Sequence, residues 1–212
     1  MYSPIEIKRK QKFGSNYWEA FSYKANRTVK LFSDLEYDHW VLVETDPDIK
    51  AFCEQPKQIT KMINGRIVST IFDMWVNLID NQQAFIEVKY ISDLKKKDVS
   101  LQIKAQKLWC EEYGFKHHIK NEIEIRGNLV LLENRKVILS YIRNLEYPSK
   151  ENINIILKNI STSKISIGAI ETIITNLDTY KIREVICWML YKGMIKANID
   201  KVRFTSQTEV WI

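Results

Sequence analysis

The feature that most constrains the fold is a series of apolar runs separated by tight-turn signals. Asn64-Gly65 separates QITKMI from RIVSTIFDMWVNLI, and Asp80-Asn81 separates that second run from AFIEVKYI. Asn-Gly between apolar runs is a strong hairpin signal. The sequence therefore predicts three adjacent antiparallel strands.

Helical patterns flank these strands. Residues 33–44 begin with a capping serine and place apolar side chains on one stripe, and residues 100–114 do the same and end at a glycine. FKHHIKN, which follows, predicts a strand, and residues 122–147 predict a helical connection. We expect residues 1–148 to form a mixed α/β domain.

A second domain is expected after Pro148-Ser149-Lys150, because the remaining sequence is mainly helical. Its strongest helical pattern, residues 181–193, has one apolar face and ends at Gly193. Two weaker helical candidates, ENINIILKNI and SIGAIETIITNL, precede it, and two short strand candidates, MIKANI and VRFTSQTEVWI, follow it. Three helices followed by a strand pair are typical of a winged helix, so residues 149–212 are expected to form a winged-helix domain.

Composition limits the class of protein. With 212 residues and 45% hydrophobic content, the chain can bury a substantial core. It has no run of about 18 apolar residues, and its first residues lack the pattern of a secretory signal. We expect a soluble, cytoplasmic protein without a membrane partner. Cys53, Cys110 and Cys187 are far apart and have no CxxC spacing, so buried thiols are expected rather than disulfides or structural zinc.

Positive charge is concentrated near the N-terminus. The net charge of +6 suits a polyanionic partner, although many proteins with such a charge bind none. The first thirty residues contain the basic residues Lys8, Arg9, Lys10, Lys12, Lys24, Arg27 and Lys30 and the aromatic residues Phe13, Tyr17, Trp18, Phe21 and Tyr23. Such an arm either contacts DNA or packs on its own domain, and the sequence leaves both readings open.

Three charged residues carry the candidate chemistry. Glu87 and Lys89 lie two positions apart on one strand and therefore point to the same face, and a hairpin would bring Asp73 beside them. Two carboxylates that hold one or two Mg²⁺ ions are what phosphodiester hydrolysis requires. Lys89 could orient the attacking water, help to deprotonate it, or stabilise the transition state. A D…ExK pattern also arises by chance, and charges on the solvent face of a strand are ordinary.

Other candidate ligands have simpler explanations beside them. Glu36 could complete the site, but Ser33-Asp34-Leu35-Glu36 also fits a capping box. His39 could share a metal, although a lone histidine on an apolar stripe is more typical of a core. His117-His118 is more typical of a strand end than of a ligand pair, and Gln106 either touches the scissile region or faces solvent.

Several segments together resemble the TnsA endonuclease subunit of heteromeric (Tn-seven-like) transposases, which belongs to the PD-(D/E)xK nuclease superfamily. In chain order they are Ser33–Glu36, Glu44–Ile49, Glu54–Pro56, Phe72-Asp73, Ile86–Lys89 and LWCEEYGFKHHIKNEIEI, and KIREVICWMLYKGMIKANID resembles the winged-helix domain of that family. Phe72 stands where many of these nucleases carry proline, and Met74 where phenylalanine is common. Both differences leave the carboxylate of Asp73 in place.

The resemblance implies a restriction-endonuclease-like mixed sheet flanked by helices, followed by a winged-helix domain. It implies cutting of the non-transferred strand at transposon ends, with the active site at Glu36, Asp73, Glu87 and Lys89. The three carboxylates would be ligands of Mg²⁺, for which Mn²⁺ should substitute. Implied partners are transposon-end DNA, a TnsB-like transposase and a TnsC-like AAA+ ATPase, with the C-terminal domain as a docking surface.

Two alternatives stay open. One is a stand-alone PD-(D/E)xK nuclease in defence, repair or phage DNA processing. The other is a non-catalytic DNA-binding or assembly protein, in which the winged helix does the binding and the carboxylates are a relic.

Overall fold

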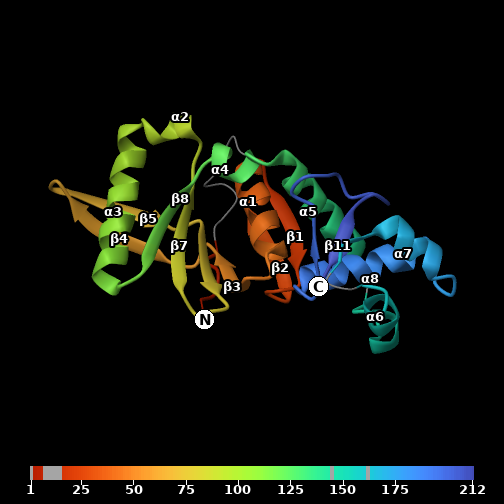
Figure 1. Ribbon diagram of the computed structural model, residues 1–212. Coiled ribbons are helices and arrows are strands. Elements are labelled where there is room, and N and C mark those ends of the chain that lie inside the picture. The colour runs from red at the N-terminus through yellow and green to blue at the C-terminus, as the bar shows by residue number, and fades with distance from the viewer. Residues whose placement is uncertain (1, 7–15, 144–145, 161–162) are drawn as a thin grey trace. The chain divides into compact units, whose positions relative to one another are not determined.

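The computed structural model describes all residues except 1, 7–15, 144–145 and 161–162. They divide into two compact units (Figure 1). Unit 1 is Met1–Glu44 with Asp48–Gly127, and unit 2 is Thr45–Pro47 with Asn128–Ile212. This division comes before the boundary expected at 148/149, because α5 (Leu129–Ile142) packs against α8 (Thr179–Tyr191). Assigning residues 1–148 to a nuclease and residues 149–212 to a winged helix stays a prediction.

A four-stranded mixed sheet is the centre of unit 1. Its strand order is β3-β6-β7-β8, where the strands are β3 (Ile49–Glu54), β6 (Met74–Leu78), β7 (Gln83–Val88) and β8 (Lys116–Lys120). The pairs β3·β6 and β6·β7 are antiparallel, whereas β7·β8 is parallel. A parallel pair needs a crossover connection, and α3 (Lys97–Tyr113) lies within it. The predicted mixed α/β class is confirmed.

The prediction of three adjacent antiparallel strands is wrong in one respect. The run RIVSTIFDMWVNLI bends at Phe72-Asp73, so that it forms two strands, β5 (Arg66–Ile71) and β6. β5 pairs with β4 (Gln58–Ile63) in a separate two-stranded hairpin, while β6 joins the central sheet. The bend buries Phe72 fully, with its ring centroid 4.5 Å from that of Phe85 and 5.6 Å from that of Trp109.

The turn of the β4–β5 hairpin has the predicted geometry. Asn64 and Gly65 both have positive φ, 51° and 75°, as a type I′ turn requires. Below the turn, Ile63 pairs with Arg66 and Met62 pairs with Ile67. Side chains of the hairpin, the central sheet and α3 form one buried core that is rich in aromatic rings. Its members are Ala51, Cys53, Ile59, Phe72, Trp75, Phe85, Trp109 and Cys110.

The predicted helices of unit 1 are confirmed. α1 (Asp34–Thr45) corresponds to the pattern at residues 33–44, and α3 ends where Gly114 adopts the left-handed conformation with φ of 73°. FKHHIKN contains β8, as expected. Two short helices, α2 (Ile91–Leu94) and α4 (Glu122–Arg126), complete the unit.

The described part of the basic N-terminal arm packs on unit 1. β1 (Trp18–Ser22) and β2 (Arg27–Leu31) form an antiparallel hairpin that the sequence did not predict. The Trp18 ring stacks on Tyr37 at 4.3 Å, and Arg27 donates from Nη2 to Glu54 Oε2 at 2.6 Å. Lys8, Arg9, Lys10, Lys12 and Phe13 lie outside the described residues. Contact between this arm and DNA stays a prediction.

Unit 2 combines helices with a small sheet. Its elements are α5, α6 (Lys150–Leu157), β9 (Ile165–Ser166), α7 (Ile167–Ile173), α8, β10 (Lys196–Ala197) and β11 (Glu209–Trp211). The strand order is β10-β11-β9, and both pairs are antiparallel. The expected helices and the final strand pair are present, whereas β9 was not predicted. The winged-helix assignment itself stays a prediction.

Two further expectations concern the chain as a whole. Cys53, Cys110 and Cys187 are buried and free, as predicted. No helix in the described part of the chain is both long and apolar enough to cross a membrane.

Candidate active site

The structure brings Asp73, Glu87 and Lys89 together. Asp73 follows the bend between β5 and β6, Glu87 lies near the end of β7, and Lys89 comes just after that strand. The Lys89 ammonium lies 3.6 Å from Asp73 Oδ2 and is in direct contact with Glu87 Oε1. The strand alternation that placed Glu87 and Lys89 on one face therefore predicted their meeting correctly.

Asp73 is held by the backbone of the neighbouring strand. The N–H of Val88 donates to Asp73 Oδ2 at 2.8 Å, and the N–H of Gln55 donates to the Asp73 carbonyl at 3.0 Å. Because these donors belong to the backbone of the domain, the carboxylate has a fixed orientation before any ligand arrives.

Glu87 is fully buried and held by two amide side chains from α3. Gln102 Nε2 donates to Glu87 Oε1 at 2.5 Å, and Gln106 Nε2 donates to Oε2 at 2.7 Å. Burial, followed by the negative charge of Asp73, raises the pKa of Glu87 to about 8. Lys89 and Gln106 oppose this rise without cancelling it, since desolvation of a carboxylate is costly.

The sequence did not identify these two glutamines as part of the site. Gln102 was not singled out, and Gln106, which is fully buried, neither faces solvent nor lies free to touch a substrate. Their spacing was the available signal, because residues four apart lie on one face of a helix. What the sequence could not supply was the packing of that face of α3 over the end of β7.

Lys89 is held as a cation. Burial lowers the pKa of its ammonium, but Asp73 and Glu87 outweigh burial, so that the pKa lies above its ordinary value. The Lys89 Nζ also donates to the Val88 carbonyl at 3.3 Å. A charged ammonium at this position can orient or stabilise an anion, whereas it is a poor proton acceptor.

The cluster opens into a polar groove of about 670 Å³. The groove is lined by β5, from Arg66 to Ile71, and by the first part of α3, including Asp98 and Gln102. Asp73 and Lys89 both line this groove. A polyanionic substrate lying in the groove would therefore reach the two reactive side chains.

Comparison with known families assigns this region. Residues 46–122 match the model of the TnsA-like endonuclease N-terminal domain. The chain contains a TnsA-like nuclease domain. The matched residues run from β3 to the start of α4 and include Asp73, Glu87 and Lys89, whereas Glu36 lies outside them. A search of curated proteins gave no match to the chain.

The donors in the TnsA-like domain suit a hard cation. Within the described residues, no group of three or more His, Cys, Asp and Glu side chains is arranged to hold a metal ion. Asp73 and Glu87 nevertheless both contact the Lys89 ammonium, and Asp73 lines the groove. Mg²⁺ is commonly bound by one or two carboxylates while it keeps several waters. The pair therefore fits Mg²⁺, with Lys89 occupying the space between the carboxylates.

Glu36, which lies outside the residues that match the family, has a clear structural role. Its oxygens accept from Phe32 N at 3.0 Å and from Ser33 Oγ at 3.3 Å, and its own N–H donates to Ser33 Oγ at 3.1 Å. The bond from Glu36 N–H to Ser33 Oγ is the first half of the predicted capping box, whereas the Glu36 side chain accepts from Phe32 N–H, where a capping box would use the Ser33 N–H. The Glu36 charge also raises the pKa of Lys89, which places it within electrostatic range of the cluster.

The histidines of unit 1 behave as core or strand residues. His39 is buried, and desolvation followed by the charge of Lys120 lowers its pKa to about 4. His117 and His118 lie in β8, where burial lowers the pKa of His117 to about 4 as well. Neutral, buried imidazoles agree with the expectation that His39 belongs to the core.

Proposed function

We propose that this protein is a metal-dependent DNA endonuclease that cuts the non-transferred strand at transposon ends, as the TnsA-like subunit of a heteromeric transposase. The observation that supports this most strongly is the meeting of Asp73, Glu87 and Lys89 within the residues that match the family. Burying two carboxylates side by side costs free energy. A fold that keeps this arrangement at the base of an open groove is explained by catalysis.

Asp73 and Glu87 would hold Mg²⁺ or, in its place, Mn²⁺, which would polarise the scissile phosphate and lower the pKa of a bound water. The chain's own contribution is to fix the ligands in advance. Val88 N–H orients the Asp73 carboxylate, and Gln102 and Gln106 orient that of Glu87. Preorganised ligands avoid a reorganisation cost during the reaction.

Lys89 would act as a cation. Its raised pKa keeps the ammonium charged, so we assign it to orienting the attacking water and to stabilising negative charge on the phosphate. This choice removes one of the three roles that the sequence left open, that of a base.

The second unit would serve as a docking surface for the TnsB-like transposase or the TnsC-like AAA+ ATPase. In a winged helix that reads DNA, the second helix of the helix-turn-helix enters the major groove. The corresponding helix here, α8, packs against both α5 and α6 and buries Ile182, Val185, Ile186 and Met189. A helix covered in this way supports a protein-docking role better than a DNA-reading one.

The experiment that tests the proposal is cleavage of labelled transposon-end DNA with Mg²⁺ or Mn²⁺, by wild type and by Asp73→Asn, each with and without the transposase partner. Cutting that requires the partner and is lost in the variant is the expected result. Cutting by the wild type alone would favour a stand-alone nuclease. Absence of cutting in every mixture would favour a non-catalytic binding or assembly role.

A further inference from the structure

The β4–β5 hairpin exposes an apolar pair near its turn. Met62 and Ile67 lie directly opposite each other in the register, and their side chains are 71% and 74% exposed. The other face of the hairpin is buried, because Ile59 and Ile63 are covered where the hairpin packs on α3. Figure 1 shows the turn of the hairpin projecting beyond α3.

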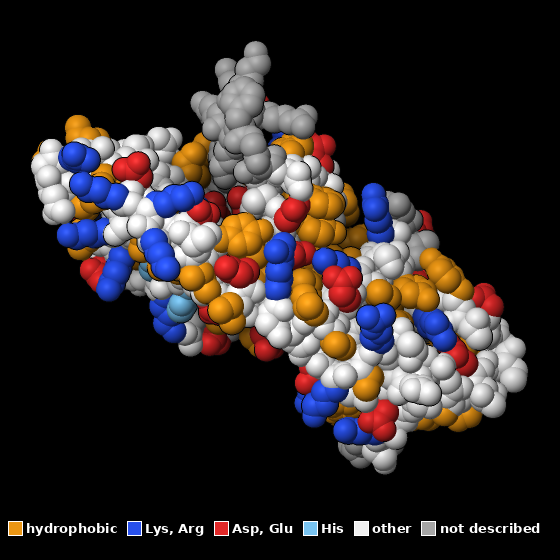
Figure 2. Space-filling model, turned by 90° about the horizontal axis from the view of Figure 1, so that it is seen from above, with side chains coloured by type: hydrophobic (Ala, Val, Ile, Leu, Met, Phe, Trp, Pro, Cys, Tyr) orange, Lys and Arg blue, Asp and Glu red, His pale blue; other side chains and the backbone are white. Residues whose placement is uncertain are grey.

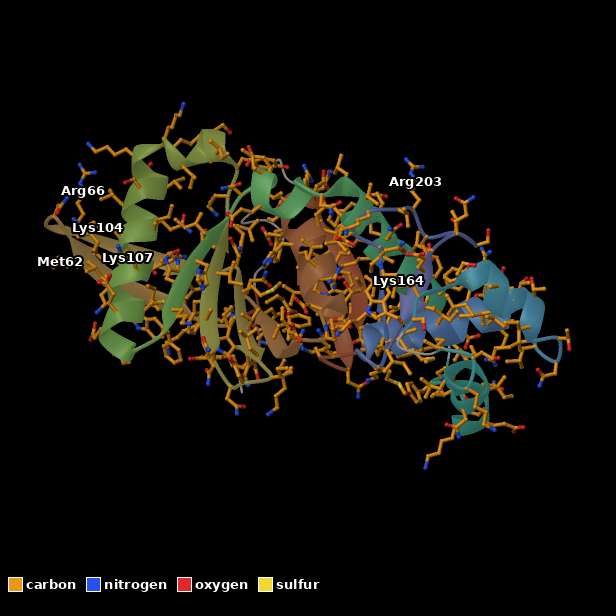
Figure 3. The ribbon with its side chains drawn as sticks, in the orientation of Figure 1. Met62, Arg66, Lys104, Lys107, Lys164 and Arg203 are labelled. Atoms are coloured by element: carbon orange, nitrogen blue, oxygen red, sulfur yellow. The ribbon has the colours of Figure 1, made fainter. Side chains whose placement is uncertain are left out.

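Positive charge lies near the end of the hairpin that carries this apolar pair. Figure 3 shows Arg66 on the hairpin and Lys104 and Lys107 on α3, close to the end that carries Met62. Within the described residues, Arg66 and Lys104 have no ion pair, and Lys107 lies 3.9 Å from Glu111. Figure 2 shows Lys and Arg side chains gathered where the hairpin and α3 lie, at the left of the view. Cations without an ion pair in the described part of the chain, such as Arg66 and Lys104, can neutralise phosphates.

We infer that the β4–β5 hairpin is a DNA-probing arm, whose Met62 and Ile67 wedge against a base step while Arg66, Lys104 and Lys107 contact flanking phosphates. The inference rests on the proposed function, because it takes the substrate to be duplex DNA. Met and Ile are among the apolar side chains that proteins insert from the minor groove to unstack and kink a duplex. Arginine beside them suits the negative potential of that groove.

The arm and the active site share one groove. Arg66 and Ile67 line the same cavity as Asp73 and Lys89. Ile67 lies four residues before Ile71, the last residue of β5, and six before Asp73, which corresponds to roughly 14–20 Å at the rise of an extended strand. Successive base pairs are about 3.4 Å apart along the axis. The wedge would therefore act about four to six base pairs from the phosphate held at the carboxylates.

The arm is built to hold its position. The type I′ turn fixes the connection at Asn64-Gly65, and Lys61 forms an ion pair with Glu112 of α3. Gln106 donates both to Thr70 Oγ1 of β5, at 3.3 Å, and to Glu87 Oε2. A single buried side chain thus links the arm to a catalytic carboxylate, so distortion of the DNA would occur at a fixed distance from the cut.

A protein partner is the less favoured occupant of this surface. Stable protein interfaces bury about 1,200–2,000 Å² in total, whereas the described residues of the hairpin expose two large apolar side chains, Met62 and Ile67. The nearby cations and the continuity with the carboxylate groove both match a duplex better. Docking of a protein on the hairpin is nevertheless a distinct outcome of the test.

The test uses the full chain, with its transposase partner present where DNA binding requires it, and transposon-end duplexes that carry 2-aminopurine at successive positions from the cleavage site. Fluorescence and affinity are measured without divalent metal, so that no cutting occurs. The variants are Met62→Ser/Ile67→Ser and Arg66→Glu. Their matched controls in unit 1 are Ile79→Ser, at a position 61% exposed, and Lys50→Glu, an exposed cation on β3.

Wild type should raise the fluorescence at about four to six base pairs from the cut, since unstacking relieves quenching. The double serine variant should abolish this rise and weaken binding less than about fivefold, because the phosphate contacts remain. Arg66→Glu should weaken binding by about tenfold and reduce the slope of log affinity against log salt by about one. Both controls should match wild type.

Three results would each overturn the proposal that the hairpin is a DNA-probing arm. They are unchanged fluorescence in the double serine variant, wild-type affinity in Arg66→Glu, and absence of DNA binding by the wild type. So would loss of binding to the transposase or the ATPase in the hairpin variants with DNA binding intact. Cleavage by wild type on the same duplexes is measured separately with Mg²⁺. If wild type cuts but the hairpin variants behave like wild type, the proposed DNA-probing arm is refuted and the proposed nuclease is not. If wild type unstacks the duplex without cutting it, the arm is supported and the proposed nuclease is refuted.

Discussion

Glu87 at the end of β7 and Glu36 at the start of α1 are both buried carboxylates, but they are held in different ways. The Glu87 oxygens accept from Gln102 and Gln106 on a separate helix and contact Lys89. The Glu36 oxygens accept from Phe32 and Ser33, within four residues along the chain. A carboxylate fixed by distant elements depends on the tertiary fold, whereas hydrogen bonds to residues close in the chain also serve the start of the acid's own helix. Burial alone therefore does not distinguish a catalytic acid from a capping acid.

The largest effect is expected at Lys89, which contacts Glu87. Lys89→Ala removes the ammonium that contacts both carboxylates, and we expect DNA cleavage to fall by about a thousandfold. DNA affinity should change by less than about threefold, since one phosphate contact at most is lost. Single-turnover cleavage with Mg²⁺ and the transposase partner measures the first quantity, and anisotropy the second.

Lys50→Ala, which removes an exposed lysine at the far end of β3, is the control for that experiment. It should cut like wild type. Cleavage by Lys89→Ala within about tenfold of wild type would contradict the assigned role, because loss of a transition-state donor generally costs more than that.

Glu36→Gln tests whether Glu36 has a role in cleavage besides its role at the start of α1. Glutamine can still accept the capping hydrogen bonds, so the stability of α1 should be retained, while the negative charge near Lys89 disappears. If Glu36 completes the metal site, as the family resemblance implies, cleavage should fall by about ten- to a hundredfold. The measurements are cleavage rate and thermal unfolding of the same preparation.

Unchanged cleavage by Glu36→Gln would restrict Glu36 to capping. Glu36→Ala then separates the two roles, because loss of the cap should cost about 1 kcal/mol of stability in either case. A cap that matters only for stability would lower the unfolding temperature of the alanine variant and leave its cleavage rate intact.

Local patterns predicted much of this molecule. Alternation along AFIEVKYI placed Glu87 and Lys89 on one face, and Asn64-Gly65 identified the hairpin turn. Helix capping and periodicity located α1, α3 and α8 to within a few residues. These features depend on backbone propensity and on one-sided burial, which a sequence displays directly.

The features that were missed depend on contacts between distant segments. Nothing local indicates that RIVSTIFDMWVNLI bends at Phe72, since the bend follows from burying that ring against Phe85 and Trp109. β3 was not recognised, because its partner β6 became a separate strand only through that bend. The packing of α5 on α8, which moved the division between the units, is likewise invisible in either helix alone.

The raised pKa of Glu87 predicts an unusual pH dependence of stability in metal-free protein. Its pKa is about 8 when folded and about 4.5 in the unfolded chain, so between these values the folded state binds the extra proton and the free energy of unfolding falls as pH rises. His39 and His117, with lowered pKa values of about 4, act in the opposite direction, but only below their ordinary value of 6.5. Between pH 6.5 and 8 the Glu87 effect should therefore dominate, at up to about 2 kcal/mol.

Denaturant unfolding in EDTA across this pH range measures the effect. Glu87→Gln removes the titrating group while keeping the side chain's size, so its stability should be nearly flat from pH 6.5 to 8. An equal slope in wild type and variant would mean that Glu87 is ionised at neutral pH and that Lys89 neutralises it more fully than its burial allows.

The smallest effect expected concerns the helix that holds Glu87. Gln106→Met keeps the shape of a buried side chain and removes the amide that donates to Glu87 Oε2 and Thr70. Losing a donor to the ionised form raises the pKa of Glu87 further and weakens its binding of a cation. The Mg²⁺ concentration that gives half-maximal cleavage should rise by about tenfold, while the rate at saturating Mg²⁺ stays within about threefold.

This split between apparent metal affinity and maximal rate distinguishes a positioning residue from a purely structural one. Gln82→Ala, at an exposed position before β7, is the control and should titrate with Mg²⁺ like wild type. If Gln106→Met instead lowered the rate equally at every Mg²⁺ concentration, the amide would act in the transition state. If neither quantity changed, the hydrogen bonds from α3 would not set the geometry of Glu87 as a metal ligand. Hydrogen bonds from a distant helix would then not distinguish a catalytic carboxylate such as Glu87 from a capping one such as Glu36.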